Sequence, residues 1–323
     1  MNIDNTHPNL TQLADQNGQM RILAIDHVNG LRKQLNMLRN NSDVTNDEIL
    51  MVKSMIIRTL KESVTGILID PFTYTHSARE MYGACGVLIK LDDGFDSSPW
   101  NSKERITKIA DVDYAELKTL GIAGVKLMLY YRHDMSPATK KAQEDIALQI
   151  AKKTAAHGLL LCLEPWWYAC KDDETDTLEG KRIIAERRPA MVIEPLREFA
   201  KKEYGVGLFK LEVPVDSTFY RFTHRSSEGD ATFLYGEDDA RKMFVAIDDI
   251  VSVPWVIMSS GVTAREFAEY VSLATRAGSS GYICGQAIWQ EGVRSFPDAK
   301  KMEAVLASTC RDNAAIINAA FTV

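Results

Sequence analysis

Eight short apolar runs, most of them ending in a polar residue, recur along the chain and constrain its fold more than any other feature. They span residues 21–26, 66–70, 86–92, 124–131, 159–165, 208–214, 254–261 and 281–286. Segments of helical periodicity lie between them, and eight strand–helix repeats are typical of a (β/α)8 (TIM) barrel. The main alternative, a doubly wound open sheet, loses support because no Gly-x-Gly-x-x-Gly follows the first run and no Walker loop is present. We therefore expect a single TIM-barrel domain over residues 1–323, with residues 1–19 as an N-terminal extension.

The segments between the runs carry recognisable helix signals. We predict helices over residues 45–63, 138–157, 189–204, 238–251, 263–277 and 300–320, and a shorter one over 113–120 within the less regular region 92–122. Thr45 with Glu48 matches the capping box at a helix start. Two long polar stretches, 171–188 and 216–237, are expected to be loops that overhang the mouth of the barrel, where the strands end.

Composition and charge exclude several classes of protein. The 46% hydrophobic and 25% charged content is ordinary for a globular protein, and the net charge of −6 argues against nonspecific nucleic-acid binding. No apolar run approaches the roughly 20 residues needed to span a bilayer, and residues 1–19 lack a signal-peptide core, so we expect a cytoplasmic protein without membrane contact. None of the five cysteines lies in a CxxC pair, which fits buried thiols in a reducing compartment.

Lys210 lies inside the apolar run 208–214. Because alternate residues of a strand face opposite sides, Lys210 and Glu212 share one face while Phe209, Leu211 and Val213 share the other. Burial favours the neutral form of a lysine, and a neutral lysine is a nucleophile. This run therefore predicts Schiff-base chemistry on a carbonyl substrate.

Three further ionisable residues occupy other predicted strands. In a barrel, Lys126 and Glu164 on the fourth and fifth strands neighbour Lys210 on the sixth, and Asp26 on the first strand lies across from them. A purely structural set of ion pairs is the alternative, but burying four charges on four strands costs free energy and is rare unless the residues serve a function. We predict that Lys126 is the neighbouring cation and Glu164 the acid/base. Asp26 is expected to hold a substrate hydroxyl or assist dehydration of the carbinolamine.

Several of these runs also carry a family resemblance. Leu23-Ala24-Ile25-Asp26, Ile67 to Pro71, Val125 to Tyr131, Leu163-Glu164-Pro165, Lys210 to Pro214, Pro254 to Val262 and Ala277 to Tyr282 resemble the class I tagatose-1,6-bisphosphate aldolases and the related sulfofructose-phosphate aldolases. The resemblance covers roughly residues 22–289. It implies a metal-independent barrel enzyme without a cofactor that cleaves a ketose phosphate into dihydroxyacetone phosphate and an aldehyde. By the same resemblance, Lys210 matches the Schiff-base lysine, Lys126 the assisting lysine and Glu164 the acid/base. No HExxH-like metal motif is present.

Two positions depart from the family pattern. Asp26-His27-Val28 stands where members read Asp-Gln-Arg, and Gly285-Gln286-Ala287 where they read Gly-Arg-Ala, whose arginine belongs to the phosphate site. Losing a charged hydrogen bond costs on the order of 1.5–3 kcal/mol, so we expect a substrate that lacks one phosphate or holds it differently. The residues expected to bind the substrate are His27, Asp70, Ser259, Ser260, Gly261, Gly285 and Gln286.

Other side chains near the predicted mouth are candidates for substrate contacts. Arg132, Arg221 and Arg225 are candidates for the missing positive charge. Trp166, Trp167 and Tyr168 either pack in the barrel wall or line the pocket for the aldehyde half.

The leading functional hypothesis is an imine-forming aldolase acting on a sugar or sugar phosphate. A transaldolase would use the same imine but pass the three-carbon unit to another aldehyde. The non-enzymatic alternative is a sugar-binding protein that has the same scaffold but no catalytic activity. Barrels of this type often pair through their outer helices, so we expect a homo-oligomer.

Overall fold

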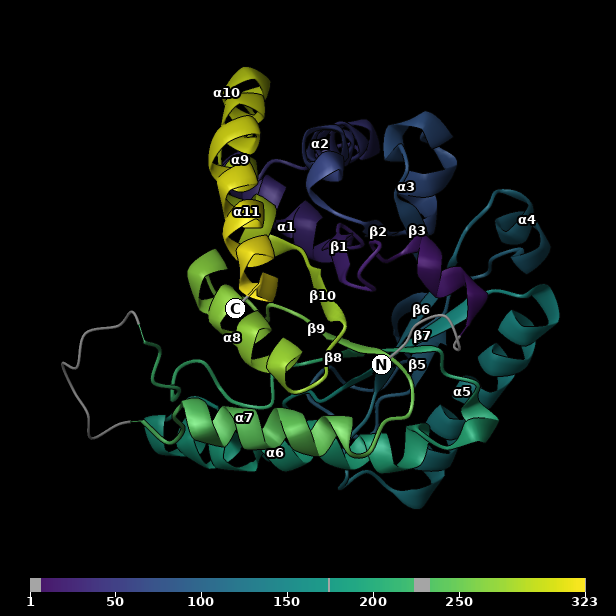
Figure 1. Ribbon diagram of the computed structural model, residues 1–323, viewed down its shortest axis with the longest axis vertical. Coiled ribbons are helices and arrows are strands. Elements are labelled where there is room, and N and C mark those ends of the chain that lie inside the picture. The colour runs from purple at the N-terminus through teal and green to yellow at the C-terminus, as the bar shows by residue number, and fades with distance from the viewer. Residues whose placement is uncertain (1–6, 174, 224–232, 323) are drawn as a thin grey trace.

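The computed structural model describes residues 7–173, 175–223 and 233–322, and a closed parallel barrel lies at its centre (Figure 1). Its strands are β1 (Met20–Ala24), β2 (Gly66–Ile69), β3 (Gly86–Lys90), β6 (Gly124–Tyr130), β7 (Leu160–Trp166), β8 (Leu208–Leu211), β9 (Trp255–Ile257) and β10 (Gly281–Cys284). They are hydrogen-bonded in the order β1-β10-β9-β8-β7-β6-β3-β2, so the predicted eight-stranded barrel is confirmed. The eight runs are apolar because parallel strands are buried on both faces.

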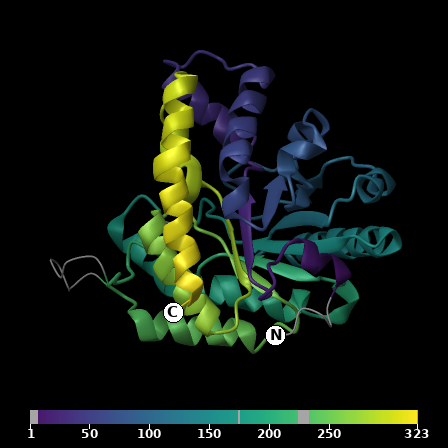
Figure 2. The same cartoon turned by 45° about the horizontal axis from the view of Figure 1, so that its top comes forward.

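Helices surround the barrel (Figure 1). They are α1 (Asn29–Leu38), α2 (Asn46–Leu60), α3 (Pro71–Thr75), α4 (Tyr114–Thr119), α5 (Pro137–His157), α6 (Leu178–Phe199), α7 (Glu237–Asp248), α8 (Ala264–Arg276), α9 (Gln286–Val293), α10 (Ala299–Val305) and α11 (Arg311–Ala319). A π-helical turn, Leu306–Cys310, joins α10 and α11 into the long yellow rod of Figure 2, which packs against α8 and α2. Thr45 and Glu48 form the predicted capping box of α2.

One predicted boundary is wrong. The stretch 171–188 is not a loop throughout, because α6 begins at Leu178, where the side chain of Thr177 accepts a hydrogen bond from the amide of Gly180. Pro189 and Pro195 lie inside this helix. A proline usually marks the first helical turn, which explains the predicted start at residue 189. Packing of the buried face of α6 outweighs the lost backbone hydrogen bonds.

Some elements carry no clear signal in the sequence. The helices α1, α3 and α9 are too short or too polar to show a regular period, and the irregular region 92–122 contains an antiparallel pair of strands, β4 (Asp92–Phe95) and β5 (Thr107–Ile109). Short 3-10 turns at Pro8–Gln12, Lys61–Ser63, Arg79–Tyr82, Lys202–Tyr204 and Ala320–Thr322 complete the structure. Within the described ranges, no helix is long and apolar enough to cross a membrane.

The described part of the expected N-terminal extension lies across the floor of the barrel. Leu10 and Leu13 are fully buried and belong to the same apolar cluster as the inward-facing residues of the strands. The side-chain amide of Asn9 donates to the carbonyl oxygens of Ala123 and Gly158, at 2.7 and 2.9 Å. The floor of the barrel is therefore apolar and closed, whereas its opposite end is polar.

Candidate active site

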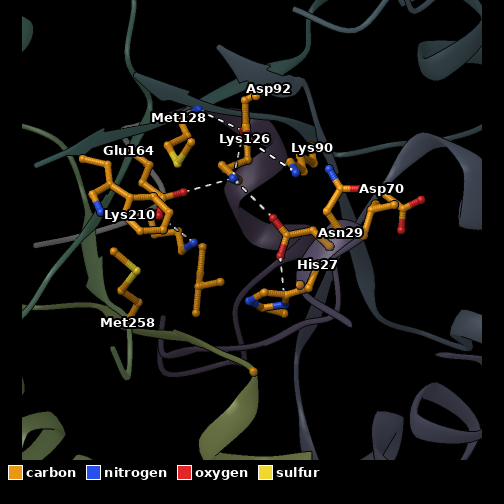
Figure 3. Close-up of a pocket in the computed structure, with 18 of the residues that line it drawn as sticks. His27, Asn29, Asp70, Lys90, Asp92, Lys126, Met128, Glu164, Lys210 and Met258 are labelled. Carbon is orange, nitrogen blue, oxygen red and sulfur yellow. Dashed lines mark hydrogen bonds and ion pairs between the residues drawn. The ribbon is translucent and has the colours of Figure 1, made fainter. Parts of the chain in front are cut away.

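A cavity of about 860 Å³ opens at the C-terminal ends of the strands, and each of the eight strands or the loop after it contributes to its lining. In open and closed α/β folds this end carries the functional side chains, because the loops after the strands converge there. The four predicted catalytic residues, Asp26, Lys126, Glu164 and Lys210, all line this cavity. Figure 3 shows Lys126, Glu164 and Lys210 among the residues around it.

Lys210 and Glu164 are in direct contact. The Nζ of Lys210 donates a hydrogen bond of 2.9 Å to Oε1 of Glu164, and both side chains are at least nine-tenths buried. Strands β7 and β8 are neighbours, so their inward-facing residues meet over the cavity floor. The buried amine of Lys210 therefore has a proton acceptor, the carboxylate of Glu164, within hydrogen-bonding distance.

Lys126 occupies the centre of a cluster of three carboxylates (Figure 3). Its Nζ lies 2.9 Å from Asp92, 3.0 Å from Glu164 and 3.3 Å from Asp26. Burial alone would lower the pKa of Lys126, but the carboxylates of Asp92, Glu164 and Asp26 raise it well above its usual value. Lys126 is therefore a fixed cation at neutral pH.

The same ion pairs keep Asp26 charged. Burial would raise the pKa of Asp26, but the ammonium charges of Lys126 and Lys210 hold it below its ordinary value. Asp26 is thus an anion at neutral pH that can accept a hydrogen bond from a substrate hydroxyl.

Asp92 is a buried member of this charged cluster that sequence reasoning missed. Lys90 and Lys126 are paired residues on the adjacent strands β3 and β6, so two ammonium groups approach each other inside the barrel. Asp92 lies between them, with one oxygen 2.9 Å from Lys126 and the other 3.4 Å from Lys90. The signal was available: Asp92 follows Lys90 by two residues at the end of its run.

His27, one of the residues predicted to bind the substrate, lines the cavity. Its ring packs edge-on against Trp289, and its Nδ1 is 3.8 Å from Asp26. Burial lowers the pKa of His27, and the charge of Asp26 only partly opposes this. The imidazole is therefore neutral at pH 7 and suited to donate or accept a hydrogen bond.

Asp70 lines the cavity, but its carboxylate is already engaged. It forms a buried ion pair with Lys53 of α2. It also caps α3 by accepting hydrogen bonds from the amide and hydroxyl of Thr73. Lys53 is 1% exposed and was not expected to take part. The structure thus gives Asp70 a structural role beside any contact with the substrate.

The two loops after β9 and β10 also border the cavity. Ser259, Ser260 and Gly261 line one side, and Gly285 and Gln286 line the side where α9 begins. A Cβ on Gly285 would lie 2.6 Å from the carbonyl oxygen of Ala24, so only glycine allows this close approach of α9 to β1. The predicted binding residues are therefore gathered around one space.

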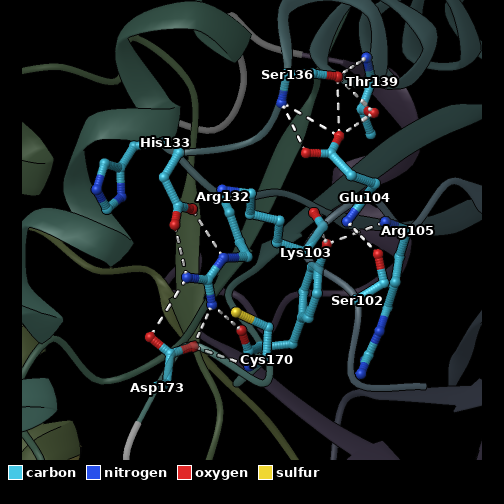
Figure 4. A network of polar contacts seen from close by, with 12 residues as sticks. Ser102, Lys103, Glu104, Arg105, Arg132, His133, Ser136, Thr139, Cys170 and Asp173 are labelled. Carbon is cyan, nitrogen blue, oxygen red and sulfur yellow. Dashed lines mark hydrogen bonds and ion pairs between the residues drawn. The ribbon is translucent and has the colours of Figure 1, made fainter. Parts of the chain in front are cut away.

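The expectation that Arg132 supplies positive charge to the substrate is wrong. Its guanidinium is buried away from the cavity and binds the carboxylates of Asp134 and Asp173 and the carbonyl of Tyr168 (Figure 4). Arg221 is exposed and does not line the cavity, and Arg225 lies outside the described residues. Of the predicted aromatic residues, Trp166 lines the cavity, whereas Trp167 and Tyr168 pack against the Arg132 guanidinium.

The network around Arg132 holds the rim of the barrel in place. Figure 4 shows Arg132 and Asp173 on one side and Glu104 with Ser136 and Thr139 on the other. These contacts join the loops after β6 and β7 to the β4–β5 arm. Because the arm begins at Asp92, the network also helps to fix one of the carboxylates around Lys126.

No group of three or more histidine, cysteine, aspartate or glutamate side chains in residues 7–173, 175–223 and 233–322 is arranged to hold a metal ion.

The comparison with known families decides the class of protein. A family model described as "DeoC/LacD family aldolase" matches residues 22–291, most of the chain. The chain belongs to this family of aldolases. The predictions of an aldolase and of a barrel fold are both confirmed.

Individual relatives agree with the family. This aldolase is 30% identical over 292 residues to tagatose 1,6-diphosphate aldolase 1 of Enterococcus faecalis, covering 89% of this chain and 85% of the relative. It is 26% identical over 290 residues to tagatose 1,6-diphosphate aldolase of Listeria monocytogenes, covering 89% and 82%.

Solved structures share the fold. A fructose-bisphosphate aldolase from Plasmodium falciparum superposes with a TM-score of 0.67 at 15% identity, covering 99% of this chain and 94% of that one. A Schiff-base-forming fructose-1,6-bisphosphate aldolase superposes with a TM-score of 0.55 at 19% identity, covering 94% and 98%.

Proposed function

We propose that this aldolase acts through a Schiff base on Lys210 and cleaves a ketose phosphate into a dihydroxyacetone phosphate unit and an aldehyde. The observation that carries the proposal is the contact of Lys210 with Glu164, whose second oxygen lies 3.0 Å from the fixed cation Lys126. Imine chemistry requires an amine, a proton acceptor and a nearby permanent charge, and here these three groups are buried next to one another.

In the first half of the proposed reaction, the neutral amine of Lys210 attacks the ketone carbon, and loss of water gives an iminium ion. Glu164 exchanges protons with this centre because it already contacts Nζ. Lys126 stays charged throughout and stabilises the carboxylates and the oxygen on which negative charge develops.

In the second half, a carboxylate removes the proton of the hydroxyl group beside the scissile bond. The carbon–carbon bond breaks, its electron pair flows into the iminium ion to form an enamine, and the aldehyde leaves. We assign the base to Glu164, while Asp26 holds a substrate hydroxyl from the other side of Lys126, 3.3 Å away. Protonation of the enamine and addition of water then release the ketone and restore the amine.

The choice of a ketose phosphate rests on the relatives and on the shape of the cavity. The relatives described above are named for ketose bisphosphates. A volume of about 860 Å³ accommodates a six-carbon sugar with a phosphate, since ligand pockets commonly measure roughly 300–1,000 Å³. The serine and glycine turn at 259–261 offers hydrogen-bond donors for an anion.

Borohydride trapping tests the proposal. The protein is incubated with dihydroxyacetone phosphate, reduced, digested and mapped by mass spectrometry. A reduced adduct on Lys210, absent from Lys210→Met and present in the exposed control Lys181→Met, is the expected result. Absence of any adduct from folded wild-type protein, with dihydroxyacetone phosphate and with dihydroxyacetone, would overturn the Schiff-base mechanism.

A further inference from the structure

We infer that Arg188, on α6 outside the barrel strands, binds the anionic group on the ketone half of the substrate, which rests on the function proposed above. Arg188 was not singled out by the sequence. Within the part of the chain that the structure describes, it is the arginine that lines the catalytic cavity.

The guanidinium of Arg188 is anchored at the end of β8. Its Nε donates to the carbonyl oxygen of Val213 at 3.0 Å, and one terminal nitrogen donates to Oε1 of Glu212 at 2.9 Å. A guanidinium carries five N–H groups, and these two contacts leave three for a ligand. Its side chain is 14% exposed, so the group is held in place and partly shielded from water.

Arg188 lies on the side of the cavity where the ketone carbon must sit. Its anchor, Glu212, lies one residue beyond the end of β8 and two residues after Lys210, so the two positions are at most on the order of 7 Å apart, and both line the cavity. A phosphate on the carbon next to the imine would be only a few bonds from Lys210. Besides Lys210 and the carboxylate-bound Lys126, Lys90 also lines the cavity, but it lies on β3, which β6 and β7 separate from β8.

The turn after β9 completes the same subsite. Ser259 and Ser260 line the main cavity with Arg188, and the three residues also line a smaller adjoining cavity of about 80 Å³. Ser260 has φ of 49°, in the left-handed region that non-glycine residues seldom occupy. The strained turn thus borders the same two cavities as Arg188, and its hydroxyls can add hydrogen bonds to an anion that Arg188 attracts.

A buried hydroxyl supports a polar occupant of this region. Tyr270 lines the smaller cavity, is 1% exposed, and its hydroxyl has no hydrogen-bond partner among the described residues. Buried hydroxyl groups are normally satisfied, by protein or by a bound polar group. Gln286, the first residue of α9 after the neighbouring strand β10, is neutral and supplies no charge.

A purely structural role for Arg188 is the competing explanation, since it neutralises the buried carboxylate of Glu212. The two roles predict a different dependence of binding on the phosphate group of the ketone. An anion-binding residue favours dihydroxyacetone phosphate over dihydroxyacetone, whereas a residue that only holds Glu212 in place affects both ketones equally.

The experiment measures the half-saturating concentration of each ketone for borohydride-trapped adduct on Lys210. The variant is Arg188→Gln, whose amide can still donate to Glu212, and the matched control is Arg187→Gln, the exposed neighbour on the same helix. For Arg188→Gln we expect the value for dihydroxyacetone phosphate to rise about tenfold to a hundredfold, with dihydroxyacetone within twofold of wild type. Arg187→Gln should match wild type with both ketones.

Other outcomes separate this inference from the proposed function. Wild-type protein that traps both ketones equally well, or an Arg188→Gln variant that keeps the phosphate preference or weakens both ketones alike, would overturn the role of Arg188 while leaving the Schiff base intact. Should Arg188→Gln fail to fold, the double variant Arg188→Gln/Glu212→Gln removes the unpaired carboxylate. The same selective loss is expected of it, and an unchanged phosphate preference would count against the inference.

Discussion

Glu164 accepts a hydrogen bond of 2.9 Å from Lys210 at the centre of the cavity. The other oxygen of this carboxylate lies 3.0 Å from Lys126. One carboxylate therefore links the proposed nucleophile to a permanent cation. A carboxylate in this position can exchange protons with the amine of Lys210.

Replacing Glu164 by glutamine should abolish most of this proton transfer while preserving the shape of the side chain. We expect kcat for aldol cleavage to fall roughly 10²- to 10⁴-fold, the usual contribution of a positioned acid/base. Steady-state kinetics of aldehyde release measure the effect, with the exposed Glu179→Gln on α6 as control. A loss of less than about fivefold would show that another group handles the protons.

Removing the cation of the cluster should destabilise the fold. In Lys126→Met, the carboxylates of Asp26, Asp92 and Glu164 stay buried without their shared partner. Breaking a buried ion pair from one side typically costs about 3–5 kcal/mol, and we expect a loss of that size in the free energy of unfolding. Urea denaturation measures it, and the exposed Lys181→Met serves as control. A loss below about 1 kcal/mol would mean that the carboxylates take up protons or find other partners.

The same cluster sets a pH dependence of stability. The folded pKa of Asp26 is depressed, so its contribution is present above its unfolded pKa of about 3.9 and is lost as the pH falls below that value. The folded pKa of Lys126 is raised, so its contribution is complete below about pH 10 and is lost only at higher pH. The combined contribution of Asp26 and Lys126 to the free energy of unfolding should therefore be constant between about pH 5 and 10.

Asp26→Asn tests the acid limb. The difference in unfolding free energy between wild type and this variant should be constant from about pH 5 to 8 and should shrink as the pH is lowered from about 5 to 3. Denaturation midpoints across this range provide the measurement. A difference that stays constant down to about pH 3 would contradict the depressed pKa of Asp26.

Lys53 and Asp70 should behave as one energetic unit. Both are almost fully buried, so Lys53→Met leaves the Asp70 carboxylate without its charge partner at a cost of about 3–5 kcal/mol. Asp70→Asn should relieve much of that cost in the double variant, because it removes the unpaired carboxylate charge. Asparagine also caps a helix, so the start of α3 is preserved. A double-mutant cycle of unfolding free energies measures the coupling, and single-variant effects that simply add would refute it.

Several parts of this site are predictable from the sequence because strand alternation and strand order are simple. The positions of Lys210, Glu164, Lys126 and Asp26 follow once the eight runs are read as a barrel, since inward-facing residues at the strand ends must converge.

Contacts made by residues on helices and loops could not be predicted in the same way. Arg188 lies in a stretch that resembles a loop because of Pro189, and its partner Glu212 is on another element. Arg132 follows a strand as a substrate-binding residue would, but Asp134 and Asp173 neutralise it. Which charge neutralises which depends on tertiary packing, and one sequence does not encode that pairing in any local pattern.

The floor of the barrel offers a final test of how the N-terminal segment belongs to the fold. A Cβ on Gly86, at the start of β3, would lie 2.2 Å from the carbonyl oxygen of Gln12. Backbone cannot yield as a flexible side chain does, so Gly86→Ala must displace the segment that buries Leu10 and Leu13. We expect a loss of about 1–3 kcal/mol in unfolding free energy and faster proteolysis near the N-terminus. Gly30→Ala is the stability control, because nothing lies within 4 Å of its added Cβ. Equal stability and equal proteolysis of the two variants would show that the segment is not held against the barrel in solution.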